Sequence, residues 1–157
     1  MIATSVLVTP ITIDDLVAEG GELFNLHFDE IRKGTEHELD PDWVQYRALE
    51  KLGMLAVYGV RDALHEDMPL VGYAVAVFVK RHLHYAMSYA TVDVVFVHPR
   101  FRRSSAARMM ADKLRAEMKT KGAAELMWHA VPGSAMHTIA EQTDRFQLRD
   151  YNYSEKL

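Results

Sequence analysis

The most informative stretch of the sequence is Val92-Asp-Val-Val-Phe-Val-His-Pro-Arg-Phe-Arg-Arg-Ser-Ser-Ala-Ala-Arg-Met-Met110. Its first six residues are rich in valine, and this β-branched density predicts a largely buried strand, which Pro99 ends. From Arg102 onward, apolar residues recur every three or four positions, a spacing typical of an amphipathic helix. The stretch therefore predicts a strand, a short turn and a helix that begins near Arg102.

The first turn of that expected helix offers a place for an anion. Its backbone N–H groups lack partners within the helix, and the helix dipole is positive at this end, which favours an anion by up to about 2 kcal/mol. Small side chains at the junction allow a ligand to approach the backbone closely: Ser104, Ser105, Ala106 and Ala107. The junction is thus a candidate site for a pyrophosphate.

Length and composition limit the remaining possibilities. A chain of 157 residues with 49% hydrophobic side chains predicts a single domain spanning residues 1–157. The absence of cysteine excludes disulfides, thiolate metal sites and an acyl group carried on a cysteine. The sequence has no charge-free apolar run near the ~20 residues that span a bilayer, and its start lacks the basic residues of a signal peptide. We therefore expect a cytoplasmic protein without a membrane partner.

Charge is distributed unevenly along the chain, although the net charge is only −4. Residues 100–121 hold eight basic and two acidic side chains, which would attract an anion. Residues 14–50 hold eleven acidic and three basic side chains. A cationic acceptor is one interpretation of the acidic region, and the solvated faces of two amphipathic helices are the other.

The order of elements predicts an α/β protein with a mixed sheet. Strands are expected at residues 6–9, 54–60, 70–79, 87–97, 125–131 and 146–153. Helices are expected from Thr12 or Asp14 to about Lys33, and at residues 43–52, 102–121 and 134–144. The second of these helices has Pro41 at its first position and Gly53 at its close, and Ser134 caps the last one. The resulting order is β-αα-βββ-α-β-α-β.

The segment Pro99-x-x-Arg102-Arg103-Ser104-Ser105-Ala106-Ala107 resembles the acyl-CoA motif of the GNAT N-acetyltransferases. In that family a strand is followed by Pro-x-x-Arg/Gln-x-x-Gly-x-Gly/Ala and a long helix. Three further segments resemble small members encoded by bacteriophages: 83–85, 128–133 and 145–156. The sequence resembles the family well over roughly residues 70–157. For the residues before 70, the resemblance rests only on the order of helices and strands. Arg103 and Ser105 occupy positions where the family usually has glycine. Near the end of the chain, Arg145-Phe146 occupies the position of a typical Gly-Phe or Gly-Tyr pair.

This resemblance implies a GNAT fold, with a mixed, twisted sheet that is splayed near its middle and flanked by about four helices. It also implies direct transfer of an acetyl group from acetyl-CoA to a primary amine. A backbone N–H near Val97, freed by a bulge, would stabilise the charge on the thioester oxygen. The expected cofactor-binding residues are Phe96, Val97, Arg102, Arg103, Ser104, Ser105, Ala106 and Ala107.

Acetylation of an amine requires a base, because a lysine-type amine has a pKa of ~10.4. Asp93 is the candidate, since it lies in an otherwise apolar strand at a position where family members often carry an acidic base. A carboxylate there must face a cavity or be paired. Two interpretations stay open for Asp93: a catalytic base, or a structural partner of an arginine or of backbone N–H groups.

The group that protonates the departing thiolate is open as well. Many family members use a tyrosine in the last helix, and the resemblance puts Glu141 at that position. Ser134, His137 and Tyr151 are unranked substitutes, and a thiolate can also leave without protonation. His129, beside Trp128, is a candidate base or proton relay, and His84 with Tyr85 could line an acceptor pocket. Each also has a structural interpretation, and the histidine spacing matches no known metal site.

Two classes of function follow. The first is an acetyl-CoA-dependent N-acetyltransferase whose acceptor is an amine on a small molecule, a protein or a modified base. The second is a catalytically degenerate GNAT-fold module for binding or host interaction. Apart from a modified base as substrate, a nucleic-acid partner is not expected, because the basic helix lacks interleaved aromatic residues. A homodimer is possible, and a phage-encoded protein would act in the host cytoplasm.

Overall fold

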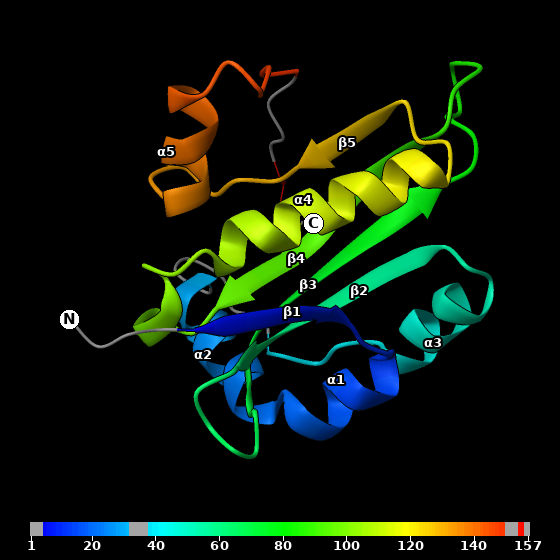
Figure 1. The fold of residues 1–157 in the computed structure, drawn as a ribbon. Helices are drawn as coiled ribbons and strands as arrows, with labels where there is room; N and C mark the ends of the chain where they lie inside the picture. The colour runs from blue at the N-terminus through cyan, green and yellow to red at the C-terminus, as the bar shows by residue number, and fades with distance from the viewer. Residues whose placement is uncertain (1–4, 32–37, 150–153, 156–157) are drawn as a thin grey trace.

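The computed structural model describes residues 5–31, 38–149 and 154–155. Its centre is one five-stranded sheet in the order β1-β2-β3-β4-β5 (Figure 1). The pairs β1–β2, β2–β3 and β3–β4 are antiparallel, whereas β5 is parallel to β4. The mixed sheet predicted from the element order is therefore confirmed.

The strands are β1 (Val6–Pro10), β2 (Leu55–Asp62), β3 (Leu70–Val79), β4 (Tyr89–Val97) and β5 (Glu125–Trp128). The helices are α1 (Ile13–Glu19), α2 (Gly21–Ile31), α3 (Trp43–Lys51), α4 (Ala106–Thr120) and α5 (Ala135–Gln142), with a 3₁₀ turn at Pro99–Phe101. The described chain thus has five α-helices, one more than the expected four.

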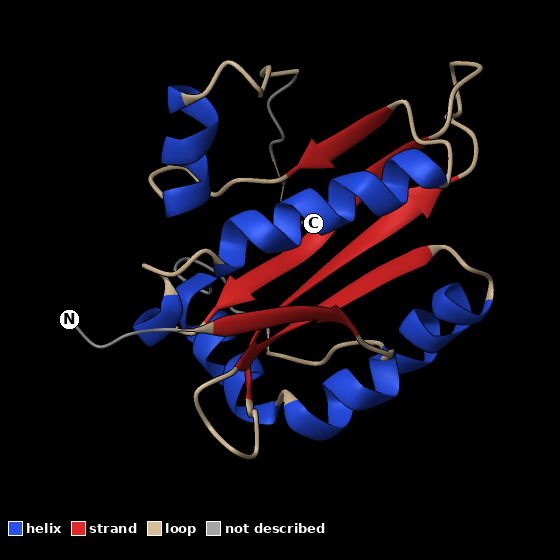
Figure 2. Ribbon diagram, viewed as in Figure 1, coloured by secondary structure: helices blue, strands red, loops and turns tan. Residues whose placement is uncertain are grey.

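Helices cover both faces of the sheet (Figure 2). On one face, α4 buries an apolar stripe at helical spacing against β2, β3 and β4: Ala106, Met110, Leu114 and Met118. On the other face, α1, α2 and α3 pack over a second core that includes Leu16, Leu23, Val75 and Phe96. The strands between the two layers are apolar on both sides, as the dense valines of β4 predicted.

The long first helix predicted to Lys33 is divided in two. Gly20 separates α1 from α2, and the Phe24 ring packs so closely on it that a Cβ at Gly20 would lie 2.5 Å from Cζ. The Gly20-Gly21 pair thus ends one helix and lets the next begin at a new angle. The predicted end of this first helix, at Lys33 and Gly34, lies outside the described residues.

The helix predicted at residues 43–52 is confirmed as α3, although Pro41 is not in its first turn. Asp42 is the N-cap and accepts a hydrogen bond from the N–H of Gln45 (2.9 Å), so Pro41 precedes the cap. After the helix, Gly53 adopts a φ of 69°, the left-handed conformation that glycine tolerates best.

The helix predicted to begin near Arg102 begins four residues later, at Ala106. His98 and Pro99 start a 3₁₀ turn instead, in which the Arg100 N–H donates to Nδ1 of His98 (3.3 Å). A non-helical turn follows, and Ser105 is the N-cap of α4. The basic residues Arg102 and Arg103 therefore lie in the connection and not on the helix.

A bulge interrupts β4, and it lies at Asp93 and not near Val97. Ala76 pairs with Val92 and Val75 with Val94, so Asp93 is the extra residue that has no partner on β3. Val97 pairs regularly with Gly72. The bulge places both Asp93 and Val94 toward α1–α3, because Val92 packs in the core under α4 and Val94 packs in the core on the opposite face.

The C-terminal region differs most from the prediction. The strand predicted at residues 125–131 ends at Trp128, and residues 146–149 of the predicted last strand are not a strand. The remainder of that strand, including Tyr151, lies outside the described residues. Among the helices of the described chain, none is long and apolar enough to cross a membrane.

Candidate functional site

The sheet is splayed between β4 and β5. The two strands pair only from Tyr89 with Glu125 to Val92 with Trp128, and β4 then continues alone to Val97. The N–H of His98 donates to the carbonyl of Val71 on the β3 side (2.8 Å). Because backbone groups alternate in direction along a strand, the N–H groups of Val95 and Val97 point away from β3, toward the splay. The splay implied by the family resemblance is thus present, with free donors along one edge.

The first turn of α4 lies just beyond this edge and is open to a ligand. Ser105, the N-cap, forms no side-chain cap, because its Oγ donates to Sδ of Met109 (3.2 Å). Ser104 Oγ accepts from the N–H of Ala106 (3.2 Å), which leaves the N–H groups of Ala107 and Arg108 without acceptors in the helix. Free N–H groups beside small side chains fit a pyrophosphate.

The residues that replace glycine in this turn cause no backbone strain. Ser105 has a φ of −78°, and Met68 is the only non-glycine residue of the described chain with a positive φ. The backbone of the turn therefore needs no glycine. Arg103 and Ala107 are exposed beside the first turn of α4.

Arg102 binds protein groups instead of facing the first turn. Its Nε donates to the carbonyl of Val97 (3.0 Å), its NH2 group forms an ion pair with Glu30 of α2, and its guanidinium lies 5.5 Å from the centre of the Phe96 ring. Arg102 thus ties the turn to β4 and α2. The Phe96 side chain is buried in the core and its backbone N–H and carbonyl point toward β3, so neither faces the splay.

His27 of α2 also packs on the Phe96 ring. The two rings stack with centroids 4.9 Å apart, and Nδ1 of His27 shares a hydrogen bond with the Tyr73 hydroxyl (2.9 Å). Burial lowers the pKa of His27, and the nearby Arg102 lowers it further against the opposing effect of Glu30. His27 therefore binds a proton less readily here than a histidine in water does.

Asp93 lies beside the splay and is paired, but with neither of the expected partners. The Tyr46 hydroxyl of α3 donates to Oδ2 of Asp93. Burial, together with this hydrogen bond, raises the pKa of Tyr46, so the phenol keeps its proton. The carboxylate itself is exposed at the bulge. Asp93 therefore combines a fixed orientation with access to solvent.

His129 approaches the same region from the other side of the splay. It follows the last residue of β5, and its Nε2 shares a hydrogen bond of 3.0 Å with Oγ1 of Thr91 on β4. Thr91 precedes Asp93 by two residues. The candidate relay therefore contacts β4 two residues from the candidate base.

Ser134 and His137, the candidates at α5 for protonating the thiolate, form hydrogen bonds at the start of that helix. Ser134 is the N-cap and accepts from the N–H of His137 (3.2 Å), and the N–H of Gly133 donates to Nδ1 of His137 (3.2 Å). Glu141, at the position where the family often has tyrosine, lies 3.4 Å from Nε2 of His137. Tyr151 lies outside the described residues.

His84 and Tyr85 lie in the loop between β3 and β4. That loop precedes β4, whereas the first turn of α4 follows it, so the two lie at opposite ends of the strand (Figure 1). The Tyr85 side chain is exposed and its ring lies 4.7 Å from that of His82. The structure therefore does not bring His84 and Tyr85 to the first turn of α4.

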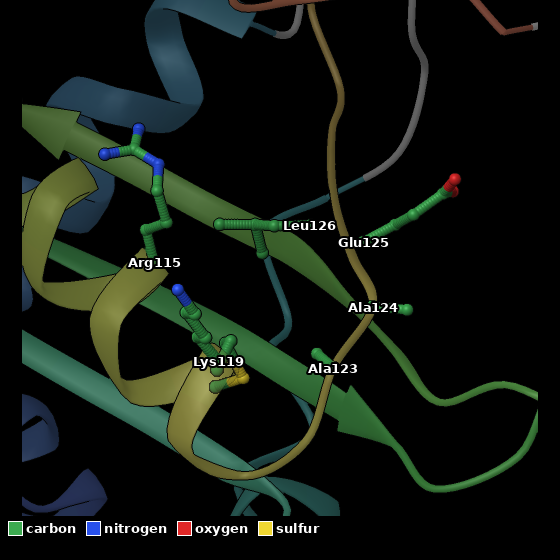
Figure 3. Close-up of a pocket in the computed structure, with 7 residues that line it drawn as sticks. Arg115, Lys119, Ala123, Ala124, Glu125 and Leu126 are labelled. Atoms are coloured by element: carbon green, nitrogen blue, oxygen red, sulfur yellow. The ribbon is translucent and has the colours of Figure 1, made fainter.

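A pocket of about 210 Å³ lies elsewhere, between the last turns of α4 and the start of β5 (Figure 3). Its lining combines cationic and apolar side chains: Arg115, Met118, Lys119, Ala123, Ala124, Glu125 and Leu126. It is at the far end of α4 from the free N–H groups. Within the described chain, no three His, Asp or Glu side chains converge in a way that could hold a metal ion.

Much of the acidic region is used for structure. Asp14 forms an ion pair with Arg47, Glu19 with Arg61 and Glu30 with Arg102. Asp15 takes part in the capping box of α1, and Glu50 accepts from the N–H of Ile13. These contacts favour the interpretation as helix surface over a dedicated cationic site.

Sequence reasoning missed Tyr46, Thr91 and His27. Tyr46 and Asp93 are 47 positions apart, and nothing in the local pattern of α3 marks one aromatic residue as the partner of a distant carboxylate. The only signal was the expectation that Asp93 needs a partner.

Comparison with known proteins agrees with this geometry. Residues 22–140 match the model of the acetyltransferase (GNAT) family. No curated protein matches the chain.

Three solved structures are similar over nearly the whole chain. Ribosomal-protein-alanine N-acetyltransferase from Brucella melitensis biovar Abortus 2308 is 17% identical, with a TM-score of 0.68 and coverage of 98% of this chain and 99% of that one. Aminoglycoside antibiotic 6'-N-acetyltransferase AAC(6')-Ih from Acinetobacter baumannii is 14% identical (TM-score 0.67; coverage 98% and 99%). Glucosamine-6-phosphate N-acetyltransferase from Arabidopsis thaliana is 13% identical (TM-score 0.71; coverage 97% and 98%).

At such identities these three structures establish the fold and leave the acceptor open. The family model covers most of the chain, and the splay and the first turn of α4 are where the motif predicts them. The chain therefore belongs to the acetyltransferase (GNAT) family.

Proposed function

We propose that the protein transfers an acetyl group from acetyl-CoA directly to a primary amine. The proposal rests on one observation. The pairing between β4 and β5 ends beside Asp93, and the free N–H groups at the start of α4 follow the end of β4 in the chain. An anion site and a carboxylate thus border one splay. These are the two features that binding of a CoA thioester and deprotonation of an amine require.

The residues would divide the work as follows. The N–H groups of Ala107 and Arg108, with Arg103 nearby, would bind the pyrophosphate, while a backbone N–H on the free edge of β4, near Val97, would donate to the thioester oxygen. Acetyl-CoA supplies the activated acetyl group. The amine nitrogen bonds to the acetyl carbon as the C–S bond breaks, and the amine proton passes to Asp93.

His129 is a candidate base or proton relay, supported by its hydrogen bond to Thr91, two residues before Asp93. The thiolate of CoA can leave as a reasonably stable anion, so transfer does not depend on a tyrosine in α5. The acceptor, a homodimer, a bacteriophage origin and a cytoplasmic location stay predictions from the sequence.

Release of CoA thiol tests the proposal. The protein is mixed with acetyl-CoA and four amines: a lysine peptide, a peptide with N-terminal alanine, glucosamine 6-phosphate and an aminoglycoside. We expect release to depend on at least one amine, and we expect Asp93→Asn to lower kcat by about 10²- to 10⁴-fold, the usual contribution of a general base. Glu66→Gln, which changes an exposed carboxylate in the β2–β3 loop, is the matched control and should keep full activity.

Two other outcomes would contradict the proposal in different ways. A protein that binds acetyl-CoA without releasing thiol would be a binding module of the GNAT fold. A protein that Asp93→Asn leaves fully active would use another base.

A further inference from the structure

Among the described residues, only Tyr46 donates a hydrogen bond to the carboxylate of Asp93, the candidate base. Asp93 follows Val92, which packs in the core under α4, so the alternation of side chains directs Asp93 to the face of α1–α3, and the bulge leaves it without a partner on β3. Tyr46 reaches it from the first turns of α3, a helix fixed by the Asp42 cap. The pairing thus depends on two separate local features.

The Tyr46 ring is held firmly in place. It lies 5.6 Å from the Trp43 ring, which in turn lies 5.2 Å from Phe24 of α2, and it packs against the core beneath α1–α3. Burial keeps its hydroxyl protonated, so the hydroxyl donates to a carboxylate and cannot take a proton from the amine. Tyr46 is therefore suited to orient Asp93 and not to replace it.

The two oxygens of the Asp93 carboxylate differ in their hydrogen bonding. Oδ2 accepts from Tyr46, and no side chain or backbone group of the described residues donates to Oδ1. The terminal torsion of an aspartate is broad and roughly two-fold, so an unpaired carboxylate would sample many orientations. A donor on one oxygen fixes the plane of the group and the direction in which the other oxygen points.

We propose that Tyr46 is a positioning residue that holds the Asp93 carboxylate so that Oδ1 receives the proton of the acceptor amine. This role rests on the proposed acetyl transfer. As the amine nitrogen bonds to the acetyl carbon and the C–S bond breaks, the N–H proton passes to Oδ1, and the Tyr46 proton stays on its own oxygen.

Tyr46→Phe tests the role, because it removes the hydroxyl and keeps the ring that packs on Trp43. We expect kcat to fall on the order of tenfold through misorientation of the base, whereas KM for acetyl-CoA stays the same because the anion site lies on α4. Tyr58→Phe is the matched control. Tyr58 also donates to a carboxylate, Glu117 (2.8 Å), but on the opposite face under α4, so this variant should keep wild-type kcat.

A double-mutant cycle distinguishes positioning from a merely structural effect. If Tyr46 acts through Asp93, Tyr46→Phe should have no further effect on kcat in the Asp93→Asn background. The proposal is overturned if the two losses multiply, if Tyr46→Phe alone keeps full kcat, or if KM for acetyl-CoA rises in place of the loss in kcat.

The same data separate this proposal from the one on which it rests. Wild-type protein without amine-dependent thiol release would contradict the acetyl transfer, and the role of Tyr46 with it. Wild-type activity that needs Asp93 but not the Tyr46 hydroxyl would contradict only the positioning role. Thermal unfolding of every variant checks that a loss of kcat does not come from unfolding.

Discussion

Two charged residues from one short stretch, Asp93 and Arg102, illustrate what a sequence can and cannot reveal about single residues. The need of a lone carboxylate for a partner was predictable for Asp93, but the partner, Tyr46, lies on another element. Arg102 aligns with a cofactor motif, yet its guanidinium is engaged by Val97, Glu30 and Phe96. Residue types and spacing thus identified where the chemistry would lie, whereas contacts distant in sequence decided what each side chain does.

His27 provides a prediction at this scale, because burial lowers its pKa below the ordinary value of 6.5. The folded protein therefore binds this proton less readily than the unfolded chain does. Its contribution to the free energy of unfolding is present above about pH 6.5 and is lost as the pH falls toward the lowered pKa. We expect the decrease in stability from about pH 7 to about pH 5.5 to be smaller in His27→Gln than in the wild type.

Urea unfolding at the two pH values measures this difference. His65→Gln, in the exposed β2–β3 loop, is the control and should show the full wild-type decrease. An equal decrease in His27→Gln and wild type would mean that burial of His27 does not perturb its titration.

At the scale of elements, the sequence was most reliable where a periodic pattern was long. The apolar spacing that defines α4 and the valines of β3 and β4 predicted those elements correctly. The boundaries failed where a side chain or a close contact overrode the pattern. The first helix is interrupted at Gly20, against which the Phe24 ring packs closely, and the 3₁₀ turn after His98 delays α4 to Ala106. The last strand was predicted at residues 146–153, within a segment that resembles small members of the family, and its described part is not a strand.

The break between α1 and α2 gives a prediction with an internal control. A Cβ at Gly20 would lie 2.5 Å from Cζ of Phe24 and 2.6 Å from the carbonyl oxygen of Leu16, whereas a Cβ at Gly21 would meet nothing within 4 Å. Gly20→Ala should therefore destabilise the protein by about 1–3 kcal/mol, as overpacking does. Gly21→Ala should be neutral or stabilising by up to about 1 kcal/mol, because alanine favours a helix.

Chemical denaturation of both variants gives the comparison. Equal effects at the two positions would show that the close packing of Phe24 on Gly20 is not what separates α1 from α2.

At the scale of the whole molecule, the sequence motif led to the correct fold, because it occupies the place where the sheet splays. Its glycines are not needed here, since the backbone at Ser105 has an ordinary negative φ. The acceptor was not predictable from the sequence. Three of the similar structures are named for acetylation of a ribosomal protein, an aminoglycoside and glucosamine 6-phosphate, so the names attached to this one fold span very different acceptors.

Binding of acetyl-CoA at the first turn of α4 can be measured by calorimetric titration of acetyl-CoA into the protein and two variants. Ala107→Glu puts a negative charge at that turn, where it favours the helix but repels a pyrophosphate. Ala116→Glu makes the same change at an exposed position farther along α4. We expect saturable one-to-one binding to the wild type and to Ala116→Glu, and binding at least about tenfold weaker to Ala107→Glu. Equal affinity in all three proteins, or no binding to the wild type, would contradict the account.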